Sequence, residues 1–127
     1  MKGLSEILLV FVGGGFGSAV RFLLGRWVNA WHNQNFPFGT LSVNIVACLV
    51  LGYVVGIADH RQLISPAARL FWTVGFCGGF STFSTFSAET LTLLQGGFHF
   101  TTAFYVILSL VLCLAAIFGG LYLGENS

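Results

Sequence analysis

The sequence has very little charge. Asp, Glu, Lys and Arg make up 7% of its 127 residues, whereas they make up about 25% of ordinary soluble domains. A soluble domain needs such side chains to cover its surface, and 56% of this chain is hydrophobic instead. The composition therefore predicts an all-α integral membrane protein whose main surroundings are the lipid bilayer. With a formal net charge of +1, no nucleic-acid partner is expected.

Cysteine and histidine are also scarce, and their spacing does not fit the common metal or disulfide frameworks. The cysteines fall singly in three apolar runs, without a C-x-x-C pair, and the histidines fall in or beside linkers. These residues are Cys48, Cys77 and Cys113, and His32, His60 and His99. Neither a zinc site nor a disulfide is indicated, so buried, apolar-type cysteines are the simplest expectation.

The sequence lacks the motifs of several transport and enzyme classes. It has no Gly-rich Lys-Ser/Thr loop for ATP. A small multidrug-type, proton-coupled exporter would need a carboxylate inside its first span, where this chain has Gly13-Gly14-Gly15-Phe16-Gly17 and keeps Glu6 at the edge. An intramembrane hydrolase using Ser84 or Ser109 would need a nearby base, and every histidine is at a linker. We expect no enzyme, and keep the exporter and a structural membrane subunit as alternatives.

Four apolar runs are present, and each could cross a hydrocarbon core of ~30 Å, which takes about 20 helical residues. The predicted spans are residues 4–28, 39–58, 67–94 and 101–124. The linkers between them leave no room for another domain, so residues 1–127 are expected to form one four-helix transmembrane domain with both termini on one side. The first run is too long for a cleavable signal.

Basic residues are divided almost evenly between the two sides of this arrangement. Lys2, Arg61 and Arg69 fall on the side of the termini, and Arg21 and Arg26 fall on the other. Such a weak bias predicts insertion in both directions, which would allow an antiparallel dimer. If Arg21 lies too deep in the membrane to count, the bias favours a single orientation, and both possibilities remain open.

Glycines recur at four-residue spacing inside the spans. This spacing places two glycines on one helix face, where neighbouring backbones can approach closely. The pairs are Gly13 with Gly17, Gly52 with Gly56, Gly75 with Gly79, and Gly120 with Gly124. We interpret them as helix-packing faces.

The third run combines poor helix formers from Gly75 to Phe86. A break is predicted near Gly78-Gly79. Non-helical backbone at membrane depth is tolerated only where it is buried in protein or lines a polar cavity, and free carbonyls facing a second subunit would suit a bound cation. The alternative is a continuous helix whose Ser and Thr side chains bond to its own carbonyls.

Several polar side chains lie inside the spans, where they need partners. Asn44 either holds helices together by hydrogen bonds or lines a pathway. Arg21 either attracts anions at an entrance, or extends to the membrane interface or pairs with a carboxylate. The residues that form a possible polar track are Ser84, Thr85 and Glu89 in the third run, and Tyr105, Ser109 and Cys113 in the fourth. Among them, Phe80, Phe83 and Phe86 repeat at helical spacing and are either core residues or ring edges that face an anion.

Three motifs occur in order along the chain: Gly13-Gly14-x-x-Gly17 with Arg21, Gly39-Thr40-Leu41-x-Val43-Asn44, and Gly75-Phe76-Cys77-Gly78-Gly79 followed by Thr82-Phe83-Ser84-Thr85-Phe86-Ser87. On these residues the chain resembles the Fluc (CrcB) family of fluoride channels over essentially its entire length. The resemblance implies a passive, fluoride-selective channel in the bacterial cytoplasmic (inner) membrane that exports fluoride and relieves its toxicity. It also implies a dual-topology antiparallel homodimer with one structural sodium ion at its centre.

The resemblance assigns roles to individual positions. Phe83 and Phe86 are similar to the pore phenylalanines, and Asn44 to an asparagine that donates to fluoride. The polar track would comprise Tyr105, Ser109, Ser84, Thr85 and Glu89. Thr40 would line a vestibule and Arg21 would have a vestibule or structural role, while the backbone carbonyls of Gly78 and Ser81 would hold sodium.

Four positions depart from the family pattern. Ala47 and Cys48 stand where Gly-Ser is common, Ser81 replaces a common Thr, and Cys113 occupies a place often held by Ser. Only carbonyls are needed at Ser81, so its assignment stands. Cys113 is expected to contribute little to the track, because a thiol donates a weaker hydrogen bond than a hydroxyl.

Overall fold

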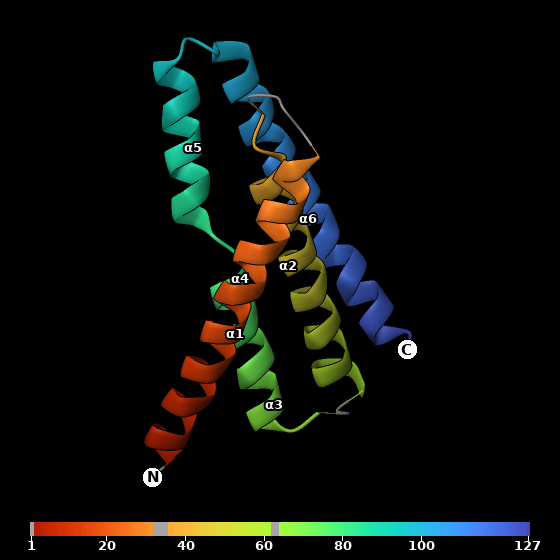
Figure 1. Ribbon diagram of the computed structural model, residues 1–127. Coiled ribbons are helices and arrows are strands. Elements are labelled where there is room, and N and C mark those ends of the chain that lie inside the picture. The colour runs from red at the N-terminus through yellow and green to blue at the C-terminus, as the bar shows by residue number, and fades with distance from the viewer. Residues whose placement is uncertain (1, 32–35, 62–63) are drawn as a thin grey trace.

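The computed structural model describes residues 2–31, 36–61 and 64–127, and the regular elements of these residues are all helices. His32 lies outside the described residues. In chain order the elements are α1 (Lys2–Ala30), α2 (Phe38–Gly56), η1 (Ile57–Arg61), α3 (Pro66–Leu70), η2 (Phe71–Cys77), α4 (Gly78–Phe80), α5 (Phe83–Gln95) and α6 (His99–Glu125). The two η elements are π-helical. Both termini lie toward the same, lower end of the molecule in Figure 1.

Three helical stretches are long and apolar enough to cross a membrane, which makes the chain an integral membrane protein. Within the described residues they are Gly3–Ala30, Phe38–His60 and His99–Glu125. They match the predicted spans 4–28, 39–58 and 101–124, each slightly longer than predicted. The run at 67–94 is different, because it is divided among α3, η2, α4 and α5, with the non-helical residues Ser81 and Thr82 in between.

The glycine pairs pack the helices in two sets. Gly13 and Gly17 of α1 face η2 and α4, and a Cβ on Gly13 would lie 2.8 Å from the carbonyl oxygen of Phe71. Gly52 and Gly56 of α2 face α6, where a Cβ on Gly56 would lie 2.7 Å from the carbonyl oxygen of Leu121. The predicted packing faces are therefore confirmed, and the structure adds which pairs meet.

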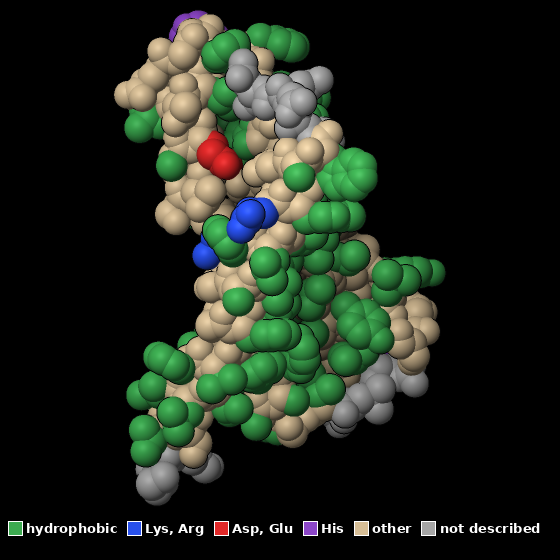
Figure 2. All heavy atoms as spheres, in the orientation of Figure 1, with side chains coloured by type: hydrophobic (Ala, Val, Ile, Leu, Met, Phe, Trp, Pro, Cys, Tyr) green, Lys and Arg blue, Asp and Glu red, His purple; other side chains and the backbone are tan. Residues whose placement is uncertain are grey.

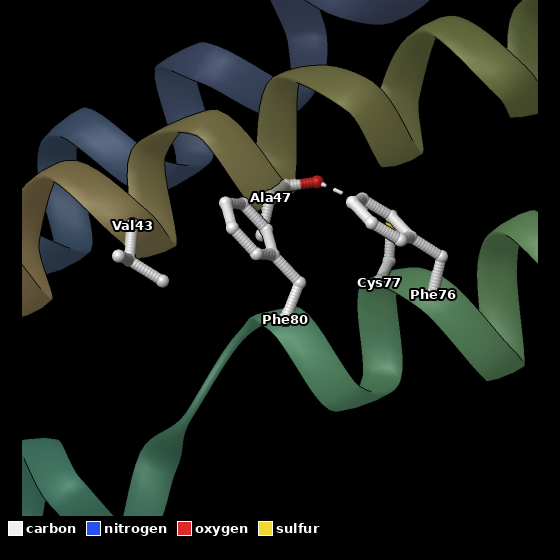
Figure 3. Close-up of a cluster of buried hydrophobic side chains, with 5 residues drawn as sticks. All are labelled: Val43, Ala47, Phe76, Cys77 and Phe80. Carbon is white, nitrogen blue, oxygen red and sulfur yellow. Dashed lines mark hydrogen bonds between the residues drawn. The ribbon is translucent and has the colours of Figure 1, made fainter. Parts of the chain in front are cut away.

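A buried cluster joins α2 to η2 and α4 (Figure 3). It consists of Val43, Ala47, Phe76, Cys77 and Phe80. The Cys77 thiol donates to the Ala47 carbonyl over 3.7 Å, and the Phe76 and Phe80 rings stack with centroids 5.3 Å apart. Of the two interpretations of the phenylalanine stripe, core packing is correct for Phe80.

Helix α5 stands apart from the other helices (Figure 1). Its only buried residue is Leu93, which joins Leu41 and Tyr105 in a second small cluster. The chain reverses after α5 at Gly97, which has φ 85°, a conformation that glycine adopts without strain. The Gly97 N–H bonds to the Leu94 carbonyl and the Phe98 N–H to the Leu93 carbonyl, and this closing motif directs the chain from α5 into α6.

Candidate functional site

The helical segment that contains α4 ends at Phe80, one residue beyond the predicted break near Gly78-Gly79. Both glycines are in a helix, while Ser81 has φ −80° and ψ 160° and is extended. The reason is a tertiary contact. The Asn44 side chain of α2 accepts a hydrogen bond from the Thr82 N–H (2.9 Å) and donates one to the Thr82 carbonyl (3.2 Å), so it satisfies both backbone groups of a residue outside any helix.

Hydroxyl groups complete the two helix ends beside this contact. The Ser81 hydroxyl donates to the Cys77 carbonyl (2.7 Å), in the manner expected of the continuous-helix alternative, but here at the point where the helix stops. The Thr82 hydroxyl accepts from the Thr85 N–H (3.1 Å) and caps the start of α5. Residues 81–82 therefore form an ordered connection with most of its polar groups satisfied.

Arg21 lies beside the same connection. Its Nε donates to the Gly79 carbonyl (3.1 Å), which also accepts from the Ser18 hydroxyl (3.4 Å). Gly79 is near the C-terminal end of a helical stretch running from 66 to 80, and a cation is favourable at that end of a helix dipole. Arg21 is thus attached to protein at one nitrogen.

One groove of about 240 Å³ runs between α2, α5 and α6. It brings together Asn44 and Ser81 with the two phenylalanines of the sequence prediction and two residues of the fourth-span polar stripe. Its lining residues are Asn44, Cys48, Ser81, Thr82, Phe83, Phe86, Ser109, Leu110 and Cys113. We call this groove the amide-phenyl groove. Three of the four departures from the family pattern, Cys48, Ser81 and Cys113, line it.

Ser109 provides a hydrogen-bonding group in this groove that no other group uses. Its side chain is 7% exposed, and its hydroxyl has no hydrogen-bond partner among the described residues. A buried hydroxyl without a partner costs free energy, and native proteins usually pair such groups. The hydroxyl is therefore available to a ligand that enters the groove.

The two phenylalanines present different surfaces. Phe83 is 77% exposed, whereas Phe86 is half-buried and packs on the ring of Tyr105 with centroids 5.0 Å apart. The Phe83 and Phe86 centroids are 5.6 Å apart, and their planes meet at 40°. Ring edges carry positive partial charge, so adjacent rings at such an angle can offer edges to an anion without holding it as a full charge would.

A second groove of about 200 Å³ lies between α1, α2 and α5, and we call it the charged groove. Arg21, Arg26, Thr40, Thr85 and Glu89 line it. In the view of Figure 2 the basic and acidic side chains lie close together beside α1 and α5, while the lower part of the same face is covered by hydrophobic side chains. Thr82 lines both grooves and separates them.

Glu89 connects three helices at this place. One carboxylate oxygen accepts from the Thr40 hydroxyl of α2 (2.9 Å), and the other accepts from the Tyr105 hydroxyl of α6 (3.0 Å). Hydrogen bonds to a carboxylate are stronger than those between neutral groups. Glu89 therefore ties α5 to the rest of the molecule.

The remaining predicted site residues lie elsewhere. Tyr105 is fully buried and lines neither groove, so within this chain it supports Phe86 and Glu89. Ser84 is exposed, with its hydroxyl 3.4 Å from that of Thr82. Gly78 is exposed on α4, and a Cβ there would meet nothing within 4 Å.

Thr82 is the residue that sequence reasoning did not single out. It binds Asn44, caps α5 and lines both grooves. A hydroxyl residue just before Phe83, at the start of a new apolar run, is a typical helix N-cap and could have indicated the first residue of α5. Its hydrogen bonds to Asn44 could not be predicted, because nothing in the neighbouring sequence indicates them.

Comparison with known proteins identifies relatives of nearly full length. The family described as "CrcB-like protein, Camphor Resistance (CrcB)" matches residues 8–121. A protein of Bacteroides fragilis named "Fluoride-specific ion channel FluC" is 45% identical over 126 residues, which are 97% of this chain and 98% of that protein. Proteins with the same name are 44% identical in Agrobacterium fabrum (95% of this chain, 97% of that protein) and 40% identical in Geobacter sulfurreducens (93% and 95%).

Proposed function

The chain belongs to the CrcB family of ion channels, and from this premise we propose that it is a passive channel selective for fluoride. It is not an enzyme. Relatives that it matches at 40–45% identity over nearly their whole length are named as fluoride-specific channels. The observation in this chain that carries the proposal is the amide-phenyl groove, where an amide, an unpartnered hydroxyl and two phenyl rings line one space.

The groove offers donors in place of the water that a small anion must shed. The Asn44 amide nitrogen has two hydrogens, and one of them is bound to the Thr82 carbonyl, so the second can serve fluoride. The Ser109 hydroxyl can rotate toward the ion, and the edges of Phe83 and Phe86 extend the path. None of these groups carries a full positive charge, so the ion can bind and also leave.

We place the channel in the bacterial cytoplasmic membrane, where it conducts fluoride out of the cell. Hydrogen fluoride enters as a neutral molecule and ionises in the more alkaline cytoplasm. Fluoride then leaves down its electrochemical gradient, and no ATP is required. Arg21 and Arg26 in the charged groove would raise the local concentration of anions, while Glu89 would order Thr40 beside them.

The functional unit in this proposal is an antiparallel dimer. The amide-phenyl groove is open along the side of one chain, and the exposed Phe83 ring forms part of its rim. A conduction path needs a wall on that side, which a second copy would supply. The near balance of basic residues between the two ends supports insertion in both orientations. Helices α3 to α5, with η2, would then form a fourth, interrupted membrane crossing.

Sodium at the dimer centre fits the end of α4. In a continued helix the Gly78 carbonyl would accept from the Thr82 N–H, but that N–H donates to Asn44 instead. The Gly78 backbone is also exposed, so a second copy can reach it. The carbonyls of Gly78 and Ser81 would hold the ion, since hard cations prefer oxygen ligands. The ion would supply a fixed positive charge that joins the two chains.

The decisive experiment measures fluoride efflux from liposomes that contain the purified protein, with a fluoride electrode. Phe83→Ile keeps an apolar side chain and removes the ring edge, so we expect efflux to fall roughly 2- to 10-fold, which corresponds to about 0.5–1.5 kcal/mol of lost aromatic interaction. Phe86→Ile should act in the same direction. Phe11→Ile is the matched control, because Phe11 is also 77% exposed and lies on α1 away from both grooves.

The alternatives predict other results. Absence of fluoride efflux from the unmodified protein would refute the channel and favour a structural membrane subunit. Proton-dependent efflux of organic cations in place of fluoride would favour the small multidrug-type exporter. Equal efflux from Phe83→Ile, Phe86→Ile and Phe11→Ile would remove the phenylalanines from the path but leave the channel assignment in place.

A further inference from the structure

Two cysteines line the wall of the amide-phenyl groove. Cys48 on α2 and Cys113 on α6 are both free and half-buried, and both line the groove. They lie one turn before a close contact of the two helices, because Gly52 and Ile117, which each follow one of the cysteines by four residues, pack with the Gly52 Cα against the Ile117 carbonyl. On their own helices they lie one turn beyond Asn44 and Ser109, so both thiols share the groove with the amide and the unpartnered hydroxyl.

The position of the two thiols is fixed by the most closely packed helix pair of the molecule. Beyond Cys48 and Cys113, the same two helices contact each other at Gly52 and Gly120, where a Cβ on either glycine would overlap the facing backbone. Sulfur ligands on such rigid elements cannot easily move apart. A site on packed helices is better organised for a ligand than a site on loops.

We propose that Cys48 and Cys113 together bind a soft monovalent cation, such as Ag⁺ or Cu⁺, and that the bound cation blocks the groove. Thiolate sulfur is the ligand that such cations prefer. They are stable with two ligands in a line, and two thiols therefore complete the site. Among the residues that the structure describes, no group of three or more His, Cys, Asp or Glu side chains could hold a metal, which disfavours a zinc-type site.

Binding of one monovalent cation releases one proton, so the net charge of the site does not change. A monovalent cation and two thiols give a sulfur-metal-sulfur unit in which one sulfur is a thiolate and the other remains a thiol, and one proton leaves. The unit is neutral, which matters because an uncompensated charge is costly to bury. No electron is transferred, so the step needs neither an oxidant nor a reductant.

Blockage by this cation rests on the proposed function, because it requires that fluoride pass through the groove. The test uses silver nitrate on protein in liposomes, in a chloride-free nitrate buffer, with fluoride efflux as the readout. We expect silver to stop efflux from the unmodified protein, and thiosulfate, which removes silver without reducing a disulfide, to restore it. For each variant, efflux with silver is divided by its own efflux without silver.

Three variants assign the site. Cys48→Ser and Cys113→Ser should each raise the half-blocking silver concentration at least about tenfold, because each removes one of the two ligands. Cys77→Ala is the matched control and should keep the sensitivity of the unmodified protein, since the Cys77 thiol is buried in the core cluster and bonded to Ala47. Equal silver sensitivity in the Cys48→Ser, Cys113→Ser double variant would overturn the proposal.

A second readout does not depend on conduction. Silver should protect Cys48 and Cys113 from maleimide, measured as adduct mass on the intact protein, and thiosulfate should remove that protection. Absence of protection overturns the site whether or not the protein conducts. If silver protects the cysteines but does not reduce a measurable fluoride efflux, the proposed blockage of the groove is wrong. If the unmodified protein shows no fluoride efflux, the channel assignment fails while the labelling still decides the metal site.

Discussion

The glycine-packed helices and helix α5 are held in the molecule by different kinds of contact. In the glycine-packed region, which comprises α1 with η2 and α4 and α2 with α6, backbones touch at Gly17, Gly79, Gly52 and Gly120. Helix α5 buries one residue, Leu93, and depends on polar bonds to Asn44, Thr40 and Tyr105. Backbone contact holds the first region, and hydrogen bonds hold the second, which carries several of the proposed site residues beside the two grooves.

This difference has a physical basis in the membrane. Lipid tails are as apolar as leucine side chains, so apolar burial alone gives helices little reason to associate, and close backbone contact supplies dispersion energy instead. A helix that lines an ion path cannot use such contact on the face toward the path. It is fixed by a few directed hydrogen bonds, which hold its polar side chains while leaving the groove open.

The largest effect is expected where backbones touch. Gly120→Ala would place a Cβ against the Leu49 carbonyl and 2.9 Å from the Tyr53 backbone nitrogen, so α2 and α6 would have to separate. We expect a loss of about 3 kcal/mol, at the upper end for overpacking, because backbone cannot move aside as a side chain can. Thermal unfolding in detergent, followed by tryptophan fluorescence, measures the loss.

Gly119→Ala is the matched control on the neighbouring residue. A Cβ on Gly119 meets nothing within 4 Å, and alanine is a better helix former than glycine. Its melting temperature should stay the same or rise slightly. If both variants melt alike, close backbone contact is not what stabilises the glycine-packed region.

A smaller effect is expected at the connection between the regions. Asn44→Ala removes both bonds to Thr82 and leaves its N–H and carbonyl without partners, at a cost of about 2 kcal/mol. It also removes a proposed fluoride donor, so efflux from liposomes should fall more than the loss of folded protein explains.

Asn126→Ala is the control for the amide deletion, because the Asn126 side chain donates to the Tyr122 carbonyl of its own helix, at the exposed end of α6. Its stability and efflux should match those of the unmodified protein. Unchanged unfolding of Asn44→Ala would show that α5 is held without this amide.

The smallest effect is expected within the contacts of α5. Tyr105→Phe removes one of the two bonds to Glu89 and keeps the ring against Phe86, so we expect a loss of about 0.6 kcal/mol, the average for hydrogen bonds between membrane helices. Tyr122→Phe removes a hydroxyl from an exposed tyrosine and should have no effect on the melting temperature. A Tyr105→Phe loss as large as that of Gly120→Ala would contradict the division between the two regions.

Sequence patterns predicted the glycine-packed region well, because its signals are local and periodic. Apolar runs located the helices now seen at Gly3–Ala30, Phe38–His60 and His99–Glu125, and four-residue spacing identified the packing faces. The pairing of α2 with α6 could not be predicted, since every glycine pair offers the same kind of surface. Which helix packs on which depends on the shapes of the helices and on the segments that connect them.

The third run was predicted less completely. Its poor helix formers pointed to a break at Gly78-Gly79, whereas those glycines are helical and the interruption lies at Ser81 and Thr82. Glycine permits a break without requiring one. The position follows from the Asn44 side chain, which is 38 residues away in the chain and offers Thr82 the donor and acceptor that a continued helix would otherwise provide.

The sequence by itself determined the membrane environment, the long apolar helices and the residue types beside the proposed path, because composition and periodicity act through local chemistry and the surrounding lipid. Only the tertiary structure decided which of those side chains share a space. It placed Asn44, Phe83, Phe86 and Ser109 in one groove, with Cys48 and Cys113 in its wall, and it paired the Tyr105 hydroxyl with Glu89. Which side chains share a groove depends on where the helices cross, and the crossing points are set by backbone contacts between segments far apart in the chain.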